Sequence, residues 1–216
     1  MSIRSIVSRV EHHGLLPVVR ARSTEQGIAL SRALHAGGIE CLEVTMTVPG
    51  AVEVISALAE QLGDSALIGA GTVLSEADGK RCLDAGARFV VSPGYVRGLP
   101  ALAHARQAAA MIGALTPSEV ITCWNEGSDF VKIFPCSAMG GASYLKALKA
   151  PLPQVKLLPT GGVTLDNIAD YLKAGASALG VGAALADIGL LEREGADAVT
   201  ALARKYVEAY HRAKVG

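Results

Sequence analysis

Three charged side chains lie in short apolar segments of this chain, where burial of a charge is energetically costly unless the charge is paired or has a chemical role. Glu43 and Lys132 each lie between aliphatic neighbours, and Arg20 ends the apolar run Leu15–Arg20. In a strand that is buried on both faces, successive side chains point to opposite sides, so the aliphatic neighbours face one side and the charge faces the other. Ionisable groups are almost never buried unless paired, which makes Glu43 and Lys132 a candidate pair.

A buried lysine beside a glutamate suggests a specific chemistry. Phe130 and Phe134 flank Lys132 in the sequence, and loss of solvation would lower the pKa of its ammonium toward the range in which a free amine exists at neutral pH. A free amine attacks carbonyl carbons, and a glutamate within reach can carry protons to and from the adduct. Lys132 and Glu43 therefore predict Schiff-base chemistry. The alternative is a buried ion pair that only sets strand register, and for Arg20 a salt bridge at a strand end.

The elements that would position these residues repeat along the chain. A glycine that ends a helical run, followed by a short apolar run typical of a buried strand, recurs four times. These segments begin at His35, Asp84, Asn125 and Lys173. Their glycines lie about 41 to 49 residues apart, roughly two βα units, so further strands should fall between them. The intervening apolar runs are Leu15–Arg20, Ala66–Ala70, Ala109–Gly113 and Val155–Pro159.

Eight strands that alternate with helical patterns predict an α/β fold, a (β/α)8 TIM barrel. The segment up to about His13 would be an extra N-terminal helix that closes the bottom, and the chain 1–216 would be one barrel domain. The expected helix N-caps are Thr24, Ser75, Thr116 and Thr164. The alternative is an open doubly wound sheet, but neither Gly69–Ala70–Gly71 nor Gly180–Val181–Gly182 has the third glycine of a dinucleotide-binding motif.

A barrel brings the carboxyl ends of its strands together at the top, where Arg20, Glu43 and Lys132 can converge. Glycine-rich segments follow the last two strands, at Thr160–Gly162 and Gly180–Gly182. Glycine lets backbone N–H groups approach an anion, so these loops favour a phosphorylated or otherwise anionic substrate. The alternative is a tight turn before a capped helix.

Two further observations concern possible ligands. Thr72 follows the third strand, and its hydroxyl could bond a substrate carboxylate or keto oxygen, although an ordinary turn accounts for it equally well. All five histidines fall on predicted helices away from the strand ends, so we expect no metal site and no histidine base.

The composition limits the partners and the compartment. Twenty Lys and Arg balance twenty Asp and Glu, so the formal net charge is zero and no strong field exists to hold nucleic acid or a membrane surface. The most apolar region is interrupted by glycines and an aspartate, which argues against a membrane span. The N-terminus lacks the apolar core of a secretory signal, and the four cysteines form no C-x-x-C pair. We therefore expect a cytoplasmic protein with reduced thiols.

Taken together, these residues resemble a known family, the 2-keto-3-deoxy-6-phosphogluconate (KDPG) and 4-hydroxy-2-oxoglutarate (KHG) aldolases, including the 6-phosphogalactonate members. The resemblance covers nearly the whole chain, and its motifs keep the order and spacing of the family. They are Leu42–Thr45, Ile68–Val73, Val91–Pro93, Val131–Pro135, Tyr144–Lys149 and Pro159–Gly162.

The resemblance implies a role for each motif residue. The Schiff-base lysine of the family falls on Lys132 and its acid/base glutamate on Glu43, which agrees with the choice made from the residues alone. Thr72 is implied to bind the carboxylate region. Pro93 and Phe134 are implied to line the pocket, and Thr160, Gly161 and Gly162 to approach the far end of the substrate. Gly182, in the glycine-rich segment of the last strand, is a further candidate for substrate binding. The family also implies a homotrimer, a small-molecule 2-keto acid as the partner, and no metal or cofactor.

Two positions depart from the family pattern. Many members carry arginine where this chain has Thr47, and Arg20 could supply that charge from the end of the first strand, as in some relatives. Members often offer a serine hydroxyl to phosphate after the last strand, where this chain reads Gly182–Ala183–Ala184. Phosphate contacts would then rest on backbone N–H groups.

The resulting expectation is a class I aldolase that cleaves a 2-keto-3-deoxy sugar acid, 6-phosphorylated as in the KDPG type, to pyruvate and an aldehyde such as glyceraldehyde 3-phosphate. Arg20 and Thr72 would hold its carboxylate. Two alternatives remain at this stage. One is a phosphosugar isomerase or epimerase on the same barrel with Glu43 as the base, and the other is a catalytically silent homolog that binds a ligand.

Overall fold

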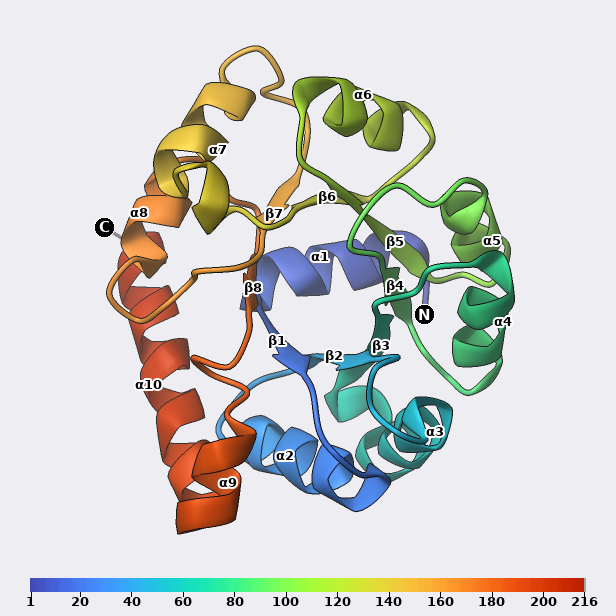
Figure 1. Cartoon of the computed structure of the whole chain (residues 1–216), viewed down its shortest axis with the longest axis vertical. Coiled ribbons are helices and arrows are strands. Elements are labelled where there is room, and N and C mark those ends of the chain that lie inside the picture. The colour runs from blue at the N-terminus through green and yellow to red at the C-terminus, as the bar shows by residue number, and fades with distance from the viewer. Residues whose placement is uncertain (216) are drawn as a thin grey trace.

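The protein is a barrel of parallel strands surrounded by helices (Figure 1). The structure is a computed structural model and describes residues 1–215. Within these residues eight parallel strands form one sheet in the order β7-β6-β5-β4-β3-β2-β1-β8. Two isolated bridges, Leu157 to Ala176 and Thr160 to Gly180, bring the two ends of the sheet together. The (β/α)8 prediction is therefore confirmed, and the open doubly wound alternative is wrong.

The strands of the barrel are β1 (Leu15–Val19), β2 (Cys41–Thr45), β3 (Leu67–Gly71), β4 (Phe89–Val91), β5 (Ala109–Ala114), β6 (Phe130–Ile133), β7 (Leu157–Pro159) and β8 (Leu179–Val181). The α-helices are α1 (Ile3–His13), α2 (Thr24–Ala36), α3 (Ala51–Leu62), α4 (Glu76–Asp84), α5 (Leu99–Ala105), α6 (Pro117–Asn125), α7 (Ala142–Lys149), α8 (Ile168–Lys173), α9 (Ile188–Glu194) and α10 (Ala196–Val215). Short 3-10 helices are η1 (Gly63–Ser65) and η2 (Ser137–Met139). No helix in the described part of the chain is both long and apolar enough to cross a bilayer.

Helix N-caps explain where several helices begin. Ser75 caps α4 and Thr116 caps α6 as expected, the latter in a capping box. Thr24 was a wrong prediction, because Ser23 caps α2 and the Thr24 hydroxyl instead donates to the carbonyl of Pro49. Thr164 was also wrong, because the loop after β7 continues beyond it before α8 begins.

The N-terminal helix α1 closes the lower end of the barrel, as the sequence predicted, and crosses behind the strands in Figure 1. Its buried side chains Ile6 and Val10 join a cluster of lumen residues that includes Phe89, Met111 and Phe130. This packing fills the lower part of the lumen with apolar side chains, because a barrel of eight strands has just enough interior for them. Polar side chains are therefore left to the upper end.

The alternation of side chains across β2 and β6 follows the prediction. Leu42 and Val44 belong to the large core cluster that contains the buried helix residues, and so do Val131 and Ile133. Glu43 lies between Leu42 and Val44, so its side chain points to the opposite side of the strand. There it accepts a hydrogen bond from Lys132 across the lumen. Strand pleating thus turns the charge toward the lumen, while its neighbours bury against the helices.

Candidate active site

The centre of the site is a buried pair of opposite charges. The Nζ atom of Lys132 on β6 lies 3.4 Å from Oε1 of Glu43 on β2, and it donates a hydrogen bond to that oxygen. Lys132 is 5% exposed and Glu43 is 1% exposed. The Nζ atom also lies 5.6 Å from the ring centroid of Phe134. The pairing inferred from two distant apolar runs is therefore present in the structure.

Two details distinguish this pair from an ion pair whose polar atoms are all bonded within the protein. The second carboxylate oxygen, Oε2 of Glu43, is buried and has no hydrogen-bond partner within the described residues. The ammonium of Lys132 has three protons but makes one hydrogen bond to a protein group in that part of the chain, to Glu43. A buried pair that only stabilised the fold would be expected to have its remaining polar atoms satisfied.

A glycine makes room for the glutamate. A Cβ atom on Gly71, at the end of β3, would lie 2.1 Å from Oε1 of Glu43 and 2.6 Å from its Cγ. Any larger residue would push the carboxylate out of its position. The next residue, Thr72, has a φ of 57°, which is rare for a β-branched residue and is a feature that clusters at functional sites.

A cavity of about 470 Å³ opens at the same end of the barrel. Its wall contains Lys132 and eight further residues that the sequence predicted: Arg20, Thr72, Pro93, Phe134, Thr160, Gly161, Gly162 and Gly182. Glu43 is not part of the wall, and it reaches the cavity through its contact with Lys132. The two departures from the family pattern also line it, at Thr47 and at Ala183 and Ala184.

Three lining residues were not predicted to be in the site: Val18, Val163 and Thr164. Val18 stands two positions before Arg20 in the sequence, so strand periodicity could have placed it on the lumen side. Conversely, Phe130 was expected to surround Lys132, but it packs in the lower apolar cluster with α1. Phe134 is the aromatic ring recorded next to the ammonium.

Arg20 lies just past the end of β1 and is exposed to solvent at the cavity. It forms no ion pair with a carboxylate anywhere in residues 1–215, so the salt-bridge interpretation is wrong. A guanidinium without a protein anion at a cavity rim is available to bind an anionic group of a ligand.

Backbone amides line another part of the cavity. Gly161 and Gly162 have φ values of 92° and 81°, a conformation that side chains with a Cβ rarely adopt. The N–H groups of Gly162, Ala183 and Ala184 donate to no acceptor in the described part of the chain. Unpartnered amides in two adjacent glycine loops form a concavity suited to an anion.

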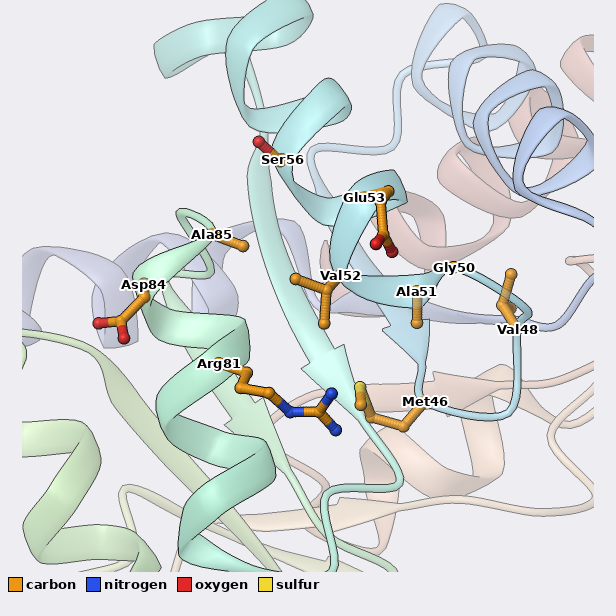
Figure 2. A pocket seen from close by; sticks show the side chains of 10 residues that line it. All are labelled: Met46, Val48, Gly50, Ala51, Val52, Glu53, Ser56, Arg81, Asp84 and Ala85. Atoms are coloured by element: carbon orange, nitrogen blue, oxygen red, sulfur yellow. The ribbon is translucent and has the colours of Figure 1, made fainter.

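A larger groove of about 760 Å³ lies elsewhere, between α3 and α4 (Figure 2). Figure 2 shows Arg81 extending from α4 toward Met46, and Val52 and Glu53 on α3. The two charged residues that α4 contributes to its wall are already paired, Arg81 with Asp78 and Asp84 with Lys80. The wall of this groove contains no lysine and none of the site residues expected from the sequence, so the smaller cavity is the candidate site.

Metal ligands are not grouped in the protein: no set of three His, Cys, Asp or Glu side chains in residues 1–215 could hold an ion. The groups at the cavity are an amine, a carboxylate, a guanidinium, threonine hydroxyls and backbone amides.

Comparison with known proteins agrees with this arrangement. The family model described as "KDPG and KHG aldolase" matches residues 6–202. The KHG/KDPG aldolase of Escherichia coli (strain K12) is 36% identical over 195 residues, which cover 90% of this chain and 91% of that protein. The chain therefore belongs to the KDPG and KHG aldolase family.

Two solved structures share its fold closely. One is a KDPG aldolase from Legionella pneumophila with pyruvate captured at low pH as a covalent carbinolamine intermediate; it has a TM-score of 0.84 and 32% identity, covering 92% of this chain and 96% of that one. The other is a cube-shaped protein cage designed by fusing symmetric oligomeric domains, with a TM-score of 0.85 and 29% identity over 94% of this chain and 73% of that one.

Proposed function

We propose that the chain is a class I pyruvate aldolase, a carbon–carbon lyase that cleaves a 2-keto-3-deoxy sugar acid through a Schiff base on Lys132. The observation that carries the proposal is the buried pair of Lys132 and Glu43 with its unsatisfied carboxylate oxygen, set against a cavity. The carbinolamine of the Legionella relative supports the same chemistry, because it is the first adduct of an amine and a keto acid.

The reaction begins when the free amine of Lys132 attacks the C2 ketone of the substrate. Glu43 carries the proton that the nitrogen loses to the C2 oxygen, which gives a carbinolamine. A second proton, taken from solvent through Glu43, lets this hydroxyl leave as water and gives a protonated imine. Removal of the proton from the C4 hydroxyl then breaks the C3–C4 bond. The electron pair of that bond moves into the imine and gives an enamine. The aldehyde departs. Protonation at C3 and addition of water release pyruvate and restore the amine.

The carboxylate end of the substrate is bound by complementary groups at one side of the cavity. Arg20 and Thr72 hold the carboxylate, and Pro93 and Phe134 line the pocket around the keto group. This places the carboxylate near the end of β1 and the imine nitrogen on β6.

The other end of the substrate extends toward the glycine loops. Thr160, Gly161, Gly162 and Gly182 lie there with Ala183, and their backbone approaches a 6-phosphate. The products are then pyruvate and glyceraldehyde 3-phosphate. Because no serine stands at Ala183, the backbone amides carry the phosphate contact.

The direct test is reduction with sodium borohydride in the presence of pyruvate, followed by peptide mass mapping. We expect one adduct, on Lys132, and none in Lys132→Ala. Lys156→Ala is a matched control, because Lys156 is also a strand-adjacent lysine over an aromatic ring but lies outside the cavity. An adduct on any other lysine, or no adduct, would refute the proposal. An isomerase would trap nothing, yet it would exchange substrate α-protons with solvent.

The assembly and the compartment are also part of the proposal. A homotrimer in the cytoplasm fits a family whose fold recurs in a cage built from symmetric oligomeric domains, and four free cysteines suit a reducing compartment. Light scattering should then give three times the chain mass of 22.2 kDa. A mass equal to that of one chain would contradict the trimer.

A further inference from the structure

The side chain of Asn167 ties together two points of the loop between β7 and α8. Its Nδ2 atom donates to the backbone carbonyl of Gly162 at 2.8 Å, and its Oδ1 atom accepts from the backbone N–H of Thr164, also at 2.8 Å. A carbonyl can only accept and a backbone N–H can only donate, so these partners fix which end of the amide faces each of them. Gly162 and Thr164 both line the cavity.

Asn167 is itself held by the start of α8. Its N–H donates to the carbonyl of Thr164 at 3.3 Å, and its carbonyl accepts from the N–H of Tyr171 at 3.2 Å. Tyr171 and the next residue, Ile168, are buried in the large core cluster. The amide of Asn167 therefore reaches the glycine-rich loop from a part of the chain that is anchored in the core.

The carbonyl that precedes Gly162 is held as well. The N–H of Ser137, on η2, donates to the carbonyl of Gly161 at 3.2 Å. A peptide group is planar and trans, so its N–H points away from its carbonyl. Because Ser137 holds the Gly161 carbonyl, the N–H of Gly162 points away from Ser137. The bond from Asn167 to the Gly162 carbonyl fixes the N–H of Val163 in the same way.

These two N–H groups are available at the cavity. Neither of them donates to a protein acceptor within residues 1–215. Val163 lines the cavity although it is only 2% exposed and its side chain packs in the core cluster, so the backbone is the part of this residue that faces the cavity. Buried backbone N–H groups are nearly always paired, which makes unpartnered ones at a cavity wall ready donors for a ligand.

We infer that Asn167 is a positioning residue for the phosphate end of the substrate, because it holds the N–H groups of Gly162 and Val163 in the direction of the anion. The inference rests on the proposed aldolase function and adds the side chain that organises its phosphate contact. Gly161 and Gly162 have positive φ and a wide conformational freedom, which the anion would otherwise have to restrict on binding. Loss of the amide should therefore weaken phosphate binding and leave the chemistry at Lys132 unchanged.

The test compares a reaction that involves the phosphate with one that does not. In Asn167→Ala we expect KM for 2-keto-3-deoxy-6-phosphogluconate to rise about three- to tenfold, the effect of one lost hydrogen bond, with kcat nearly unchanged. The inhibition constant of inorganic phosphate against this cleavage should rise by the same factor. Exchange of pyruvate methyl protons with deuterated water uses the imine but no phosphate, so its rate should stay at the wild-type value.

A variant of nearly the same shape, Asn167→Asp, isolates the bond to Gly162. Its carboxylate still accepts from the N–H of Thr164 but has no proton for the Gly162 carbonyl. We expect KM and the phosphate inhibition constant to rise at least as far as in Asn167→Ala. Asn125→Ala is the matched control, because Asn125 is the other asparagine of the chain, ends α6 and is not part of the cavity wall. It should behave as wild type, and circular dichroism checks the folding of all three variants.

The outcomes separate this inference from the proposed function. Unchanged phosphate binding in either Asn167 variant overturns the role of Asn167 while the aldolase stands. The same holds if pyruvate exchange falls as far as cleavage, which would indicate a purely structural role, or if inorganic phosphate does not inhibit the wild type. A wild-type enzyme that neither exchanges pyruvate protons nor forms a borohydride adduct overturns the aldolase itself, and the role of Asn167 with it.

Discussion

Substitution of Gly71 by alanine tests whether the position of the Glu43 carboxylate matters for catalysis. The added Cβ would lie 2.1 Å from Oε1 of Glu43, whereas ordinary contact begins at 3.4 Å, so the carboxylate must move by about 1.3 Å. Gly71 has no left-handed φ, so alanine fits the backbone and the conflict is with the side chain alone. The hydrogen bond to Lys132, already 3.4 Å long, would be lost or rebuilt elsewhere.

Two magnitudes follow from this displacement. Overpacking a filled interior costs about 1–3 kcal/mol, which for a chain of this size lowers Tm by about 2–12 °C. Misplacing a catalytic group by about 1 Å can cost on the order of a hundredfold in rate, within the range that general acid–base catalysis supplies. We therefore expect Gly71→Ala to fold with reduced Tm and to have kcat reduced about a hundredfold.

Gly69→Ala is the matched control, because Gly69 lies two residues earlier on the same strand and faces the same lumen. Its added Cβ would meet the Phe89 ring at 2.1 Å, in the apolar cluster near α1, and not Glu43. The control should lose similar stability and keep most of its kcat. The assay is pyruvate release coupled to lactate dehydrogenase, with Tm from calorimetry. If Gly71→Ala kept kcat within about threefold of wild type, or if both variants lost it equally, the reasoning about Glu43 would be wrong.

Two further predictions concern the thiols and the backbone. Burial raises the pKa of Cys41 to about 12 and that of Cys82 to about 11, and it also raises the pKa of the other two thiols. Because the thiolate is the reactive form, Ellman's reagent at pH 8 should label none of the four cysteines in the folded protein and all four in guanidinium; rapid labelling of the folded protein would contradict this. Thr72→Gly removes the strain of a left-handed threonine, about 1–2 kcal/mol, but adds about 0.5–1 kcal/mol of glycine entropy. Urea unfolding should thus show a gain of up to about 1.5 kcal/mol, and kcat/KM should fall with loss of the hydroxyl. A marked loss of stability would show that the hydroxyl holds the loop.

The local pattern of the sequence was sufficient for the barrel and for the central pair. Strand positions and the inward direction of Glu43 and Lys132 follow from alternation along each run, because strand geometry has a period of two. The meeting of side chains 89 positions apart then follows from the closure of the ring. Arg20, Thr72 and the two glycine-rich loops of the cavity wall were also predicted from the residues, and the family resemblance added Pro93 and Phe134 as pocket residues.

Other features depend on tertiary packing and had no sequence signal. The adjacent Ser23 and Thr24 are both good caps, and only the contact of Thr24 with Pro49 on the next loop decides between them. The left-handed φ of Thr72 is imposed by its surroundings against its own preference. The Thr45–Thr47 hydrogen bond also requires coordinates, because the two residues lie on a strand end and a turn whose geometry the sequence leaves open.

The two glycines of β3 show how one strand divides the lumen into a packed part and a reactive part. The Phe89 ring occupies the space that a side chain at Gly69 would need. The lower lumen is therefore filled with apolar atoms, and this packing contributes to stability. The Glu43 carboxylate occupies the corresponding space beside Gly71. Its Oε2 atom has no hydrogen-bond partner among the described residues, and this lowers stability. Because the pair lies beside the cavity, a ligand or a water molecule there can bond to these free positions and offset part of the cost.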